Sequence, residues 1–459
     1  MRFGVSMMAA ALAFAFAVPG SAAPTPEEVA QLGKTLTPVG AIKAGNADGT
    51  IPPWDGGICT PPAGYKPRNG VGGFPYVDPY ASEKPLFSIT GQNMDKYADK
   101  LDEGVKVLLK RYPNYRMDVY PTHRSACMPD WVYENTIKNV MNPRTTSGGL
   151  GLEGAHAQVP FPIPKDGYEA MWNANMKYTY PWIEGDASFL LVDAAGNRTL
   201  LNVQNVLQHL PYWDEKKEPL KSDQYYWILK STNTQPAAEV GTASLMQIYM
   251  RPDVKDNMAW SYIPGQRRVR LAPEFKYDTV SPNSGGMLLY DEINGFYGKM
   301  DKYDFKLIGR KEMYVQYNSY RTEMATQEQI GTKNFANPDY TRWELHRVWV
   351  VQADLKPGQR HVEKRKVFYI DEDSWYIFAY YGLDEAGKVY HYMQLPFWQE
   401  YEKPSPWNGN YLLYDFNKGI WSNQSQQGNP EFKQTGFYKV KPFGPGEFAP
   451  ESMAGSGLR

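Results

Sequence analysis

Residues 343–395 contain the longest strand-like pattern in the chain and constrain its fold more than any other stretch. β-branched and aromatic runs (WELHRVWVV, HVEKRKVFYI, WYIFAYYG and KVYHYMQL) alternate with the turn-forming clusters KPGQ, DEDS and DEAG. This alternation is typical of β-strands joined by hairpins, and Pro357-Gly358 suits the centre of a type II turn. The sequence therefore predicts four consecutive antiparallel strands.

The third of these strands carries apolar or aromatic side chains on both faces. Trp375, Ile377, Ala379 and Tyr381 alternate with Tyr376, Phe378 and Tyr380. In an antiparallel sheet with one face in water, half of these side chains would be polar. Something must therefore cover the second face: helices, another part of the chain, or a bound apolar ligand.

Further strand-like segments precede these four, and helical patterns are few. The strand-like segments are SFLLVD, RTLLNVQNVLQ, DQYYWILKST, ASLMQIYM, NMAWSYIP, QRRVRLAP and FKLIGRKEMYVQYN. Apolar spacing predicts a helix over 94–109 capped by Asn93, a second helix opening at Pro129, and a short one over 167–175. Ten or more strands with so few helices predict a mainly β fold of the α+β class, a large curved antiparallel sheet or incomplete β-barrel.

The first 23 residues have the layout of a secretory signal peptide. One basic residue, Arg2, precedes an apolar stretch over 7–18, the helix-breaking Pro19-Gly20 and small residues up to Ala23. We expect residues 1–23 to be removed on export. We further divide the chain into an N-terminal extended arm with helices (24–176), the curved antiparallel sheet (177–400) and a C-terminal tail that wraps over the surface (401–459).

Composition and charge exclude several classes of partner. The formal net charge is −1 and the pI about 6.6, so neither nucleic acid nor an anionic membrane is expected as the main partner. After the signal peptide, no apolar run approaches the roughly 20 residues that a membrane-spanning helix needs. The two cysteines, Cys59 and Cys127, lack CxxC spacing, and in an oxidising compartment such a pair is expected to form one disulfide.

Motifs for catalysis, metals or cofactors are not evident in the sequence. The six histidines are scattered without HxH or HExxH spacing, and no GxSxG or SxxK motif occurs. We therefore expect no enzyme activity, no metal and no cofactor. The acidic cluster Asp371, Glu372 and Asp373 fits a solvated turn better than a glycosidase pair, because adjacent strand residues point to opposite faces.

The excess of aromatic residues indicates a ligand site, with ordinary core as the alternative. One interpretation is a cavity for a lipid or other amphiphile, and the other is a platform that stacks sugars. Arg268 and Arg270 share one face of a predicted strand and are candidate polar anchors for a carboxylate or phosphate, with ion pairing as the alternative. The candidate cavity-lining residues are Trp260, Tyr262, Trp343, Trp349, Trp375, Tyr376 and Phe378.

Long ordered blocks of the sequence resemble the bacterial family called domain of unknown function 1329. They include LTPVGAIKAGNADGTIPPWDGG, DPYASEKPLFSITGQNMDKYADKL, IPGQRRVRLAPEFKYD and GFYGKMDKYDFKLIGRKEMYVQYN. The resemblance covers nearly the whole mature chain. It implies a periplasmic protein of Gram-negative bacteria with a core akin to the lipoprotein carriers LolA and LolB, an incomplete barrel around an apolar cavity. It also implies an exporter of the resistance-nodulation-division (RND) type and an outer-membrane protein as partners.

Three hypotheses follow from the residues and the resemblance together. The first is a periplasmic carrier that binds a lipid-like or other hydrophobic molecule and cooperates with an RND-type exporter. The second is an exported carbohydrate-active enzyme or sugar-binding protein, which needs two carboxylates across an open groove. The third is a structural adaptor of an export complex that binds no small molecule.

Overall fold

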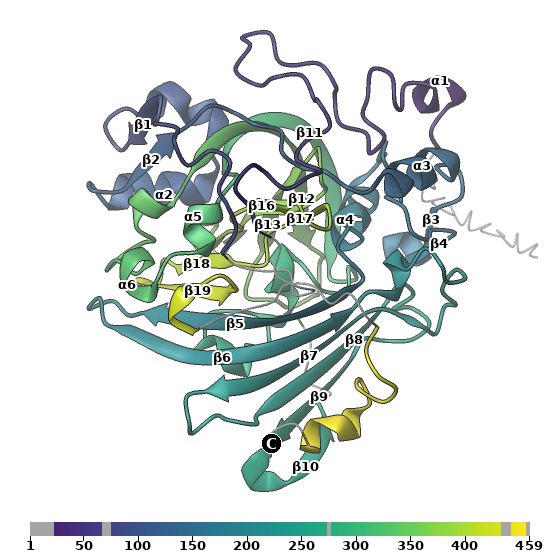
Figure 1. Ribbon diagram of the computed structural model, residues 1–459, viewed down its shortest axis with the longest axis vertical. Helices are drawn as coiled ribbons and strands as arrows, with labels where there is room; N and C mark the ends of the chain where they lie inside the picture. The colour runs from purple at the N-terminus through teal and green to yellow at the C-terminus, as the bar shows by residue number, and fades with distance from the viewer. Residues whose placement is uncertain (1–22, 67–74, 273–276, 433–441, 456–459) are drawn as a thin grey trace, which may run out of the picture.

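The computed structural model describes residues 23–66, 75–272, 277–432 and 442–455, and these form a mainly β structure (Figure 1). The signal-peptide prediction therefore lies almost entirely outside the described residues. The α-helices are α1 (Pro26–Val29), α2 (Glu103–Arg111), α3 (Asp130–Lys138), α4 (Gly167–Asn175), α5 (Tyr320–Glu323) and α6 (Gln327–Ile330). Short 3₁₀ turns include η1 (Met94–Lys100), η2 (Ser147–Gly149), η6 (Tyr290–Gly295) and η9 (Pro450–Gly455).

The strands over 182–394 follow the predicted order along the chain, whereas those before residue 154 and after residue 397 lie in segments where no strand was predicted. The first ten are β1 (Phe87–Thr90), β2 (Arg116–Val119), β3 (Arg144–Thr146), β4 (Gly151–Glu153), β5 (Trp182–Val192), β6 (Arg198–His209), β7 (Tyr225–Gln235), β8 (Ala243–Tyr249), β9 (Met258–Ile263) and β10 (Arg268–Leu271). The others are β11 (Tyr303–Gln316), β12 (Trp343–Leu355), β13 (Arg365–Asp371), β14 (Ile377–Leu383), β15 (Val389–Gln394), β16 (Trp398–Glu400), β17 (Ser405–Trp407), β18 (Tyr411–Asp415) and β19 (Ile420–Gln426).

Fifteen strands join into one sheet that is not closed into a barrel. Their order is β1-β2-β12-β13-β14-β15-β18-β19-β5-β6-β7-β8-β9-β10, with β11 paired to β12. The ladders are antiparallel except for one parallel contact between β2 and β12. The predicted large antiparallel sheet is confirmed, and β12 to β15 are the predicted meander.

The tail after residue 400 does more than wrap over the surface. β18 and β19 lie inside the sheet, between β15 and β5, and so connect the meander to the strands of the 177–271 region. β1 and β2, from the region predicted to be arm and helices, extend the other end of the same sheet. The wrapping prediction is therefore wrong for β18 and β19. Their Pro-, Gly- and Asn-rich flanks resemble a loop, but the β15 and β5 edges complete their ladders.

Each face of the meander is covered by a different layer of the protein. On one face Phe368, Ile377 and Tyr380 belong to the same core as Met171 and Trp172 of α4. On the other, Phe378 and Tyr381 pack in the same core as Val105 and Leu108 of α2. The strands are apolar on both sides because the protein's own helices and loops bury both sides.

The predicted helices are confirmed in two cases and divided in the third. α4 spans the predicted residues, with Asp166 accepting a hydrogen bond from the Glu169 N–H, and α3 begins just after Pro129. The stretch 94–109 forms η1 and then α2, and the side chain that caps α2 is Asp102, which accepts from the Val105 N–H at 2.8 Å. Asn93 instead accepts from the Thr90 N–H.

Candidate functional site

The seven aromatic candidates lie in three separate places. Trp260 and Tyr262 on β9 pack with Met453 of η9. Trp349 and Trp375 stack on each other in the core shared with α4. The remaining three, Trp343, Tyr376 and Phe378, belong to the core shared with α2. Within the described part of the chain these residues do not line one common cavity.

The space beside the meander is too small for a lipid. Tyr376 borders a cavity of about 30 Å³ that it shares with Lys177 and Trp407, which is room for a water molecule or two. The Tyr376 hydroxyl donates to the carbonyl of Tyr178 at 2.8 Å, so the ring is fixed in place. Burial lowers the pKa of Lys177 to about 8.

The two candidate anchors, Arg268 and Arg270, are exposed on β10. β10 is the last strand in the order of the sheet, at the opposite end from β1 and β2. The guanidiniums therefore share a face, as predicted, but that face is at the rim of the sheet and away from the stacked Trp349 and Trp375.

The acidic turn at Asp371, Glu372 and Asp373 is buried, so the prediction of a solvated turn is wrong. Arg124 binds both oxygens of Asp373, at 2.6 and 2.8 Å, and Arg347 Nε lies 2.6 Å from Glu372 Oε1. The cluster also includes Glu344, Arg310 and Arg342. Glu344, Glu372 and Asp373 thus each face a guanidinium, which is the pairing that buried charges require, whereas Asp371 accepts from the Ser374 hydroxyl instead.

The largest described cavities lie outside the meander, beside α3 and α4. One, of about 530 Å³, is bordered by Val140, Met141, Phe161, Ile163 and Tyr168. Its walls come from the end of α3, the β3–η2 turn and the start of α4. Phe161 is only 8% exposed and Met141 is 56% exposed at the rim, and polar side chains that include Asp166 and Glu169 border the same cavity.

A second cavity, of about 590 Å³, shares Asn142 and Arg144 with the first. Its other walls are mostly polar and include Asn135, His156 and Gln158. Arg144 is held by Glu153, 2.5 Å from its Nη2, across the β3–β4 hairpin. An apolar compartment and a polar one therefore meet at β3. Sequence analysis missed this site because its walls come from loops without a periodic pattern.

A disulfide fastens the N-terminal arm to the segment that leads into α3. It joins Cys59 to Cys127, as predicted. The Ile58 N–H also donates to the Ser125 carbonyl at 2.9 Å, so the arm follows this segment. No helix among the described residues is both long and apolar enough to span a membrane.

This molecule is thus an open-sheet, mainly β protein with a two-part cavity beside its helices. It belongs to the protein family of unknown function DUF1329, whose model matches residues 88–454. The expected family membership is confirmed. The chain is 38% identical over 401 residues to the uncharacterized protein PA3922 of Pseudomonas aeruginosa, and the match covers 87% of each chain.

Three solved structures that match this chain have low sequence identity to it. A lipoprotein-sorting protein domain from Vibrio parahaemolyticus is 11% identical with a TM-score of 0.42, over 63% of this chain and 98% of that one. A DUF1329 family protein from Desulfovibrio piger is 14% identical with a TM-score of 0.42, over 62% and 97%. A LolA superfamily protein from Nitrosomonas europaea is 10% identical with a TM-score of 0.37, over 62% and 99%.

Proposed function

We propose that the protein is a periplasmic carrier of an amphiphilic, lipid-like molecule that occupies the two-part cavity beside α3 and α4. The observation that carries this proposal is the 530 Å³ compartment lined by Val140, Phe161 and Ile163. Its volume lies in the range of pockets that bind small molecules, about 300–1,000 Å³. It opens beside the exposed side chain of Met141.

The polar compartment next to it accounts for the other end of such a molecule. An acyl or ring portion would lie between Phe161 and Ile163, and a polar head would reach Asn142 and Arg144, which border both compartments. A guanidinium pairs well with carboxylate or phosphate groups. The ligand class is therefore an amphiphile with a polar head group.

Two other hypotheses receive less support from the geometry. The carboxylates of Glu292, Glu363 and Asp373 are buried instead of facing an open groove, which a carbohydrate-active enzyme needs. Asp166 and Glu169 do border the larger apolar cavity, but both accept hydrogen bonds from backbone N–H groups at the start of α4. The hypothesis of an adaptor that binds no small molecule does not account for the 530 Å³ cavity. Cooperation with an RND-type exporter remains part of the proposal, and a pull-down from solubilised envelope with the immobilised mature protein tests it.

The carrier proposal is tested by what the protein retains. Gently purified protein is examined by native mass spectrometry and organic extraction, and titrated with an environment-sensitive apolar dye. We expect a co-purified amphiphile and saturable dye binding.

Met141→Glu places a charge at the rim of the cavity and is expected to weaken dye binding at least tenfold. The matched control is Leu271→Glu, since Leu271 is 52% exposed on β10 and borders neither cavity. Absence of any ligand and of dye binding, or equal loss in both variants, would contradict the proposal.

A further inference from the structure

A second buried charged cluster lies where residues 287–300 cross the face of the meander that α4 also covers. Met287, Leu288, Phe296 and Met300 are all at most 5% exposed and belong to the same core as the meander. Between them, η6 carries adjacent acids toward the interior: Asp291, 2% exposed, and Glu292, fully buried. This segment therefore brings negative charge into an apolar layer.

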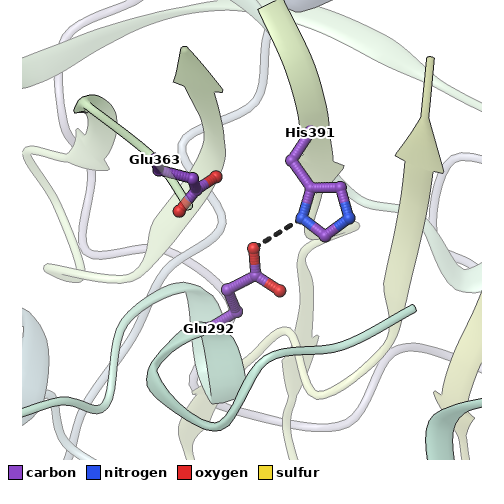
Figure 2. Close-up of side chains that lie close together, drawn as sticks. All are labelled: Glu292, Glu363 and His391. Atoms are coloured by element: carbon purple, nitrogen blue, oxygen red, sulfur yellow. Dashed lines mark hydrogen bonds and ion pairs between the residues drawn. The ribbon is translucent and has the colours of Figure 1, made fainter. Parts of the chain in front are cut away.

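Three side chains from separate parts of the chain meet there. Figure 2 shows Glu292 of η6, Glu363 just before β13, and His391 of β15 turned toward one another. Glu292 Oε1 lies 2.6 Å from His391 Nδ1. One ligand atom from each of the three lies within 4.8 Å of the other two, and the side chains of Glu292 and Glu363 are completely buried.

The carboxylates in this cluster are not each paired with a cation, as Asp373 is with Arg124. Three carboxylates, those of Asp291, Glu292 and Glu363, face one ammonium, that of Lys366, which lies 2.6 Å from Glu363 Oε2 and 3.0 Å from Asp291 Oδ2. Two negative charges are left over. An unpaired buried charge is costly, so two further positive charges are required. Protons on two histidines are one source of these positive charges: His361 contacts Asp291, and His391 contacts Glu292. One divalent cation is the other source.

One carboxylate oxygen faces the cluster without a partner. Glu363 Oε1 forms no hydrogen bond, although Glu363 is fully buried. A Cβ at position 382 would lie 1.6 Å from this oxygen. Gly382 is the cross-strand neighbour of His391. Because the glycine has no side chain, the Glu363 carboxylate can lie beside the His391 imidazole. Buried oxygen atoms are ordinarily paired, and an orphan one beside an imidazole is an available ligand.

We propose that Glu292, Glu363 and His391 bind one divalent transition-metal ion, with zinc the first choice. Zinc accepts carboxylate oxygen and imidazole nitrogen together, at about 2.0–2.2 Å. The ion supplies the two positive charges that the cluster otherwise takes from two protons, one of them between Glu292 and His391, and both protons are released to solvent.

Neighbouring groups hold these ligands in place. The Tyr380 hydroxyl donates to Glu292, the Leu289 N–H donates to Glu292 Oε2 at 2.7 Å, and Lys366 holds the second oxygen of Glu363. Such contacts orient ligands around a metal. Because Glu292 comes from η6 and His391 from β15, the ion fastens residues 287–300 to the sheet, and its role is structural.

The test uses the mature chain purified without a metal-affinity step, together with protein unfolded in chelator and refolded with Zn²⁺, Co²⁺ or neither ion. Unfolding is needed because the site is buried. We expect one zinc per chain by native mass spectrometry and elemental analysis, a higher melting temperature after refolding with Zn²⁺, and visible d–d absorption from bound Co²⁺. Binding of less than a tenth of an equivalent by refolded wild-type protein, with no change in melting temperature, would assign the balancing charge to protons and overturn the proposal.

Variants locate the ion. Glu363→Gln keeps the shape of the side chain and His391→Gln removes the imidazole, and each is expected to lower zinc affinity at least tenfold. Asp371→Asn alters the other group of ligand-type side chains in the described structure, His346, Asp371 and Asp373, and is expected to keep one zinc per chain. Unchanged zinc content in Glu363→Gln and His391→Gln, or equal loss in Asp371→Asn, would place the ion elsewhere. Circular dichroism verifies that each variant folds. Where a variant does not fold, the zinc stoichiometry and the cobalt spectrum of the wild-type protein decide whether the ion is bound.

Discussion

Trp375 stacks on Trp349, with ring centroids 5.9 Å apart and planes 13° from parallel. The Trp375 indole N–H donates to the Val39 carbonyl at 3.0 Å, and the Arg310 guanidinium lies over the Trp349 ring at 4.0 Å from its centroid. The pair therefore connects the meander to the N-terminal arm. It is a structural joint and leaves no room for a ligand between the rings.

Replacing Trp375 with Phe is expected to lower the free energy of unfolding by about 2 kcal/mol or more. The substitution removes a buried hydrogen bond and leaves a cavity next to Trp349. Denaturant unfolding followed by circular dichroism measures the loss, and hydrogen exchange should show faster opening around Val39. Trp260→Phe is the control, because Trp260 is only partly buried on β9. Equal losses in the two variants would contradict this role for Trp375.

α2 is held against β15 at a position where only glycine fits. A Cβ on Gly104 would lie 2.1 Å from Tyr392 Cδ2, and the Tyr392 hydroxyl donates to Asp102 at 3.0 Å. In an exposed helix, Gly→Ala stabilises by about 1 kcal/mol. Here Gly104→Ala is expected to destabilise by about 1–3 kcal/mol, because the extra methyl overpacks the contact.

The comparison for Gly104 is Gly265→Ala in the β9–β10 turn. A Cβ at Gly265 meets no atom within 4 Å. The unfolding free energy of the Gly265→Ala variant should therefore differ from that of the wild type by less than about 0.5 kcal/mol. A stabilised Gly104→Ala variant, as helix propensity alone predicts, would show that α2 moves freely away from Tyr392.

The helices and strands that nearby residues determine were predicted from the sequence. The strands of the meander follow from alternation and turn chemistry, and α4 spans the predicted residues 167–175. The division of 94–109 into η1 and α2 was missed, because both Asn93 and Asp102 have the chemistry of a cap and only one of them caps a helix in the structure.

Features that depend on distant partners were not predicted. An Asp-Glu-Asp turn is solvated unless arginines reach it, and Arg124 reaches Asp373 from far away in the sequence. The place of β18 and β19 inside the sheet depends on two edges that only the folded chain creates. For the same reason Glu292, Glu363 and His391 match no motif, since each comes from a different segment.

The Cys59–Cys127 disulfide is expected to contribute substantially to stability. It closes a loop with a sequence separation of 68 residues, which in the chain-entropy model corresponds to about 4 kcal/mol. Cys59 is exposed, so reductant reaches it. Unfolding of the wild-type protein should shift to lower denaturant concentration in reductant, whereas a Cys59→Ala/Cys127→Ala double variant should be insensitive to it. A wild-type midpoint that stays unchanged after both thiols titrate as free would contradict the prediction.

Glu323 at the end of α5 should make stability fall as pH rises. Burial raises its pKa from the ordinary 4.5 to about 7, although the Gln427 N–H donates to its carboxylate at 2.6 Å. Between these two pKa values the folded state holds a proton that the unfolded state has lost, so the free energy of unfolding decreases with pH and the full cost is present above pH 7. A shift of this size corresponds to about 3 kcal/mol.

Glu323→Gln removes this cost and should stabilise the protein at pH 8 by up to about 3 kcal/mol, with little effect near pH 4.5.

Glu344→Gln is the control with the opposite sign. Burial raises the pKa of Glu344, but hydrogen bonds from His346 and Arg342 outweigh it and hold that pKa below its ordinary value. Its charge is stabilising at neutral pH, so Glu344→Gln should destabilise there and lose that effect only as the pH falls below 4.5. Denaturant unfolding of the three proteins at pH 3, 4.5, 6 and 8 makes the comparison, and a Glu323→Gln variant whose stability parallels the wild type at all four pH values would show that Glu323 is ionised in the folded protein.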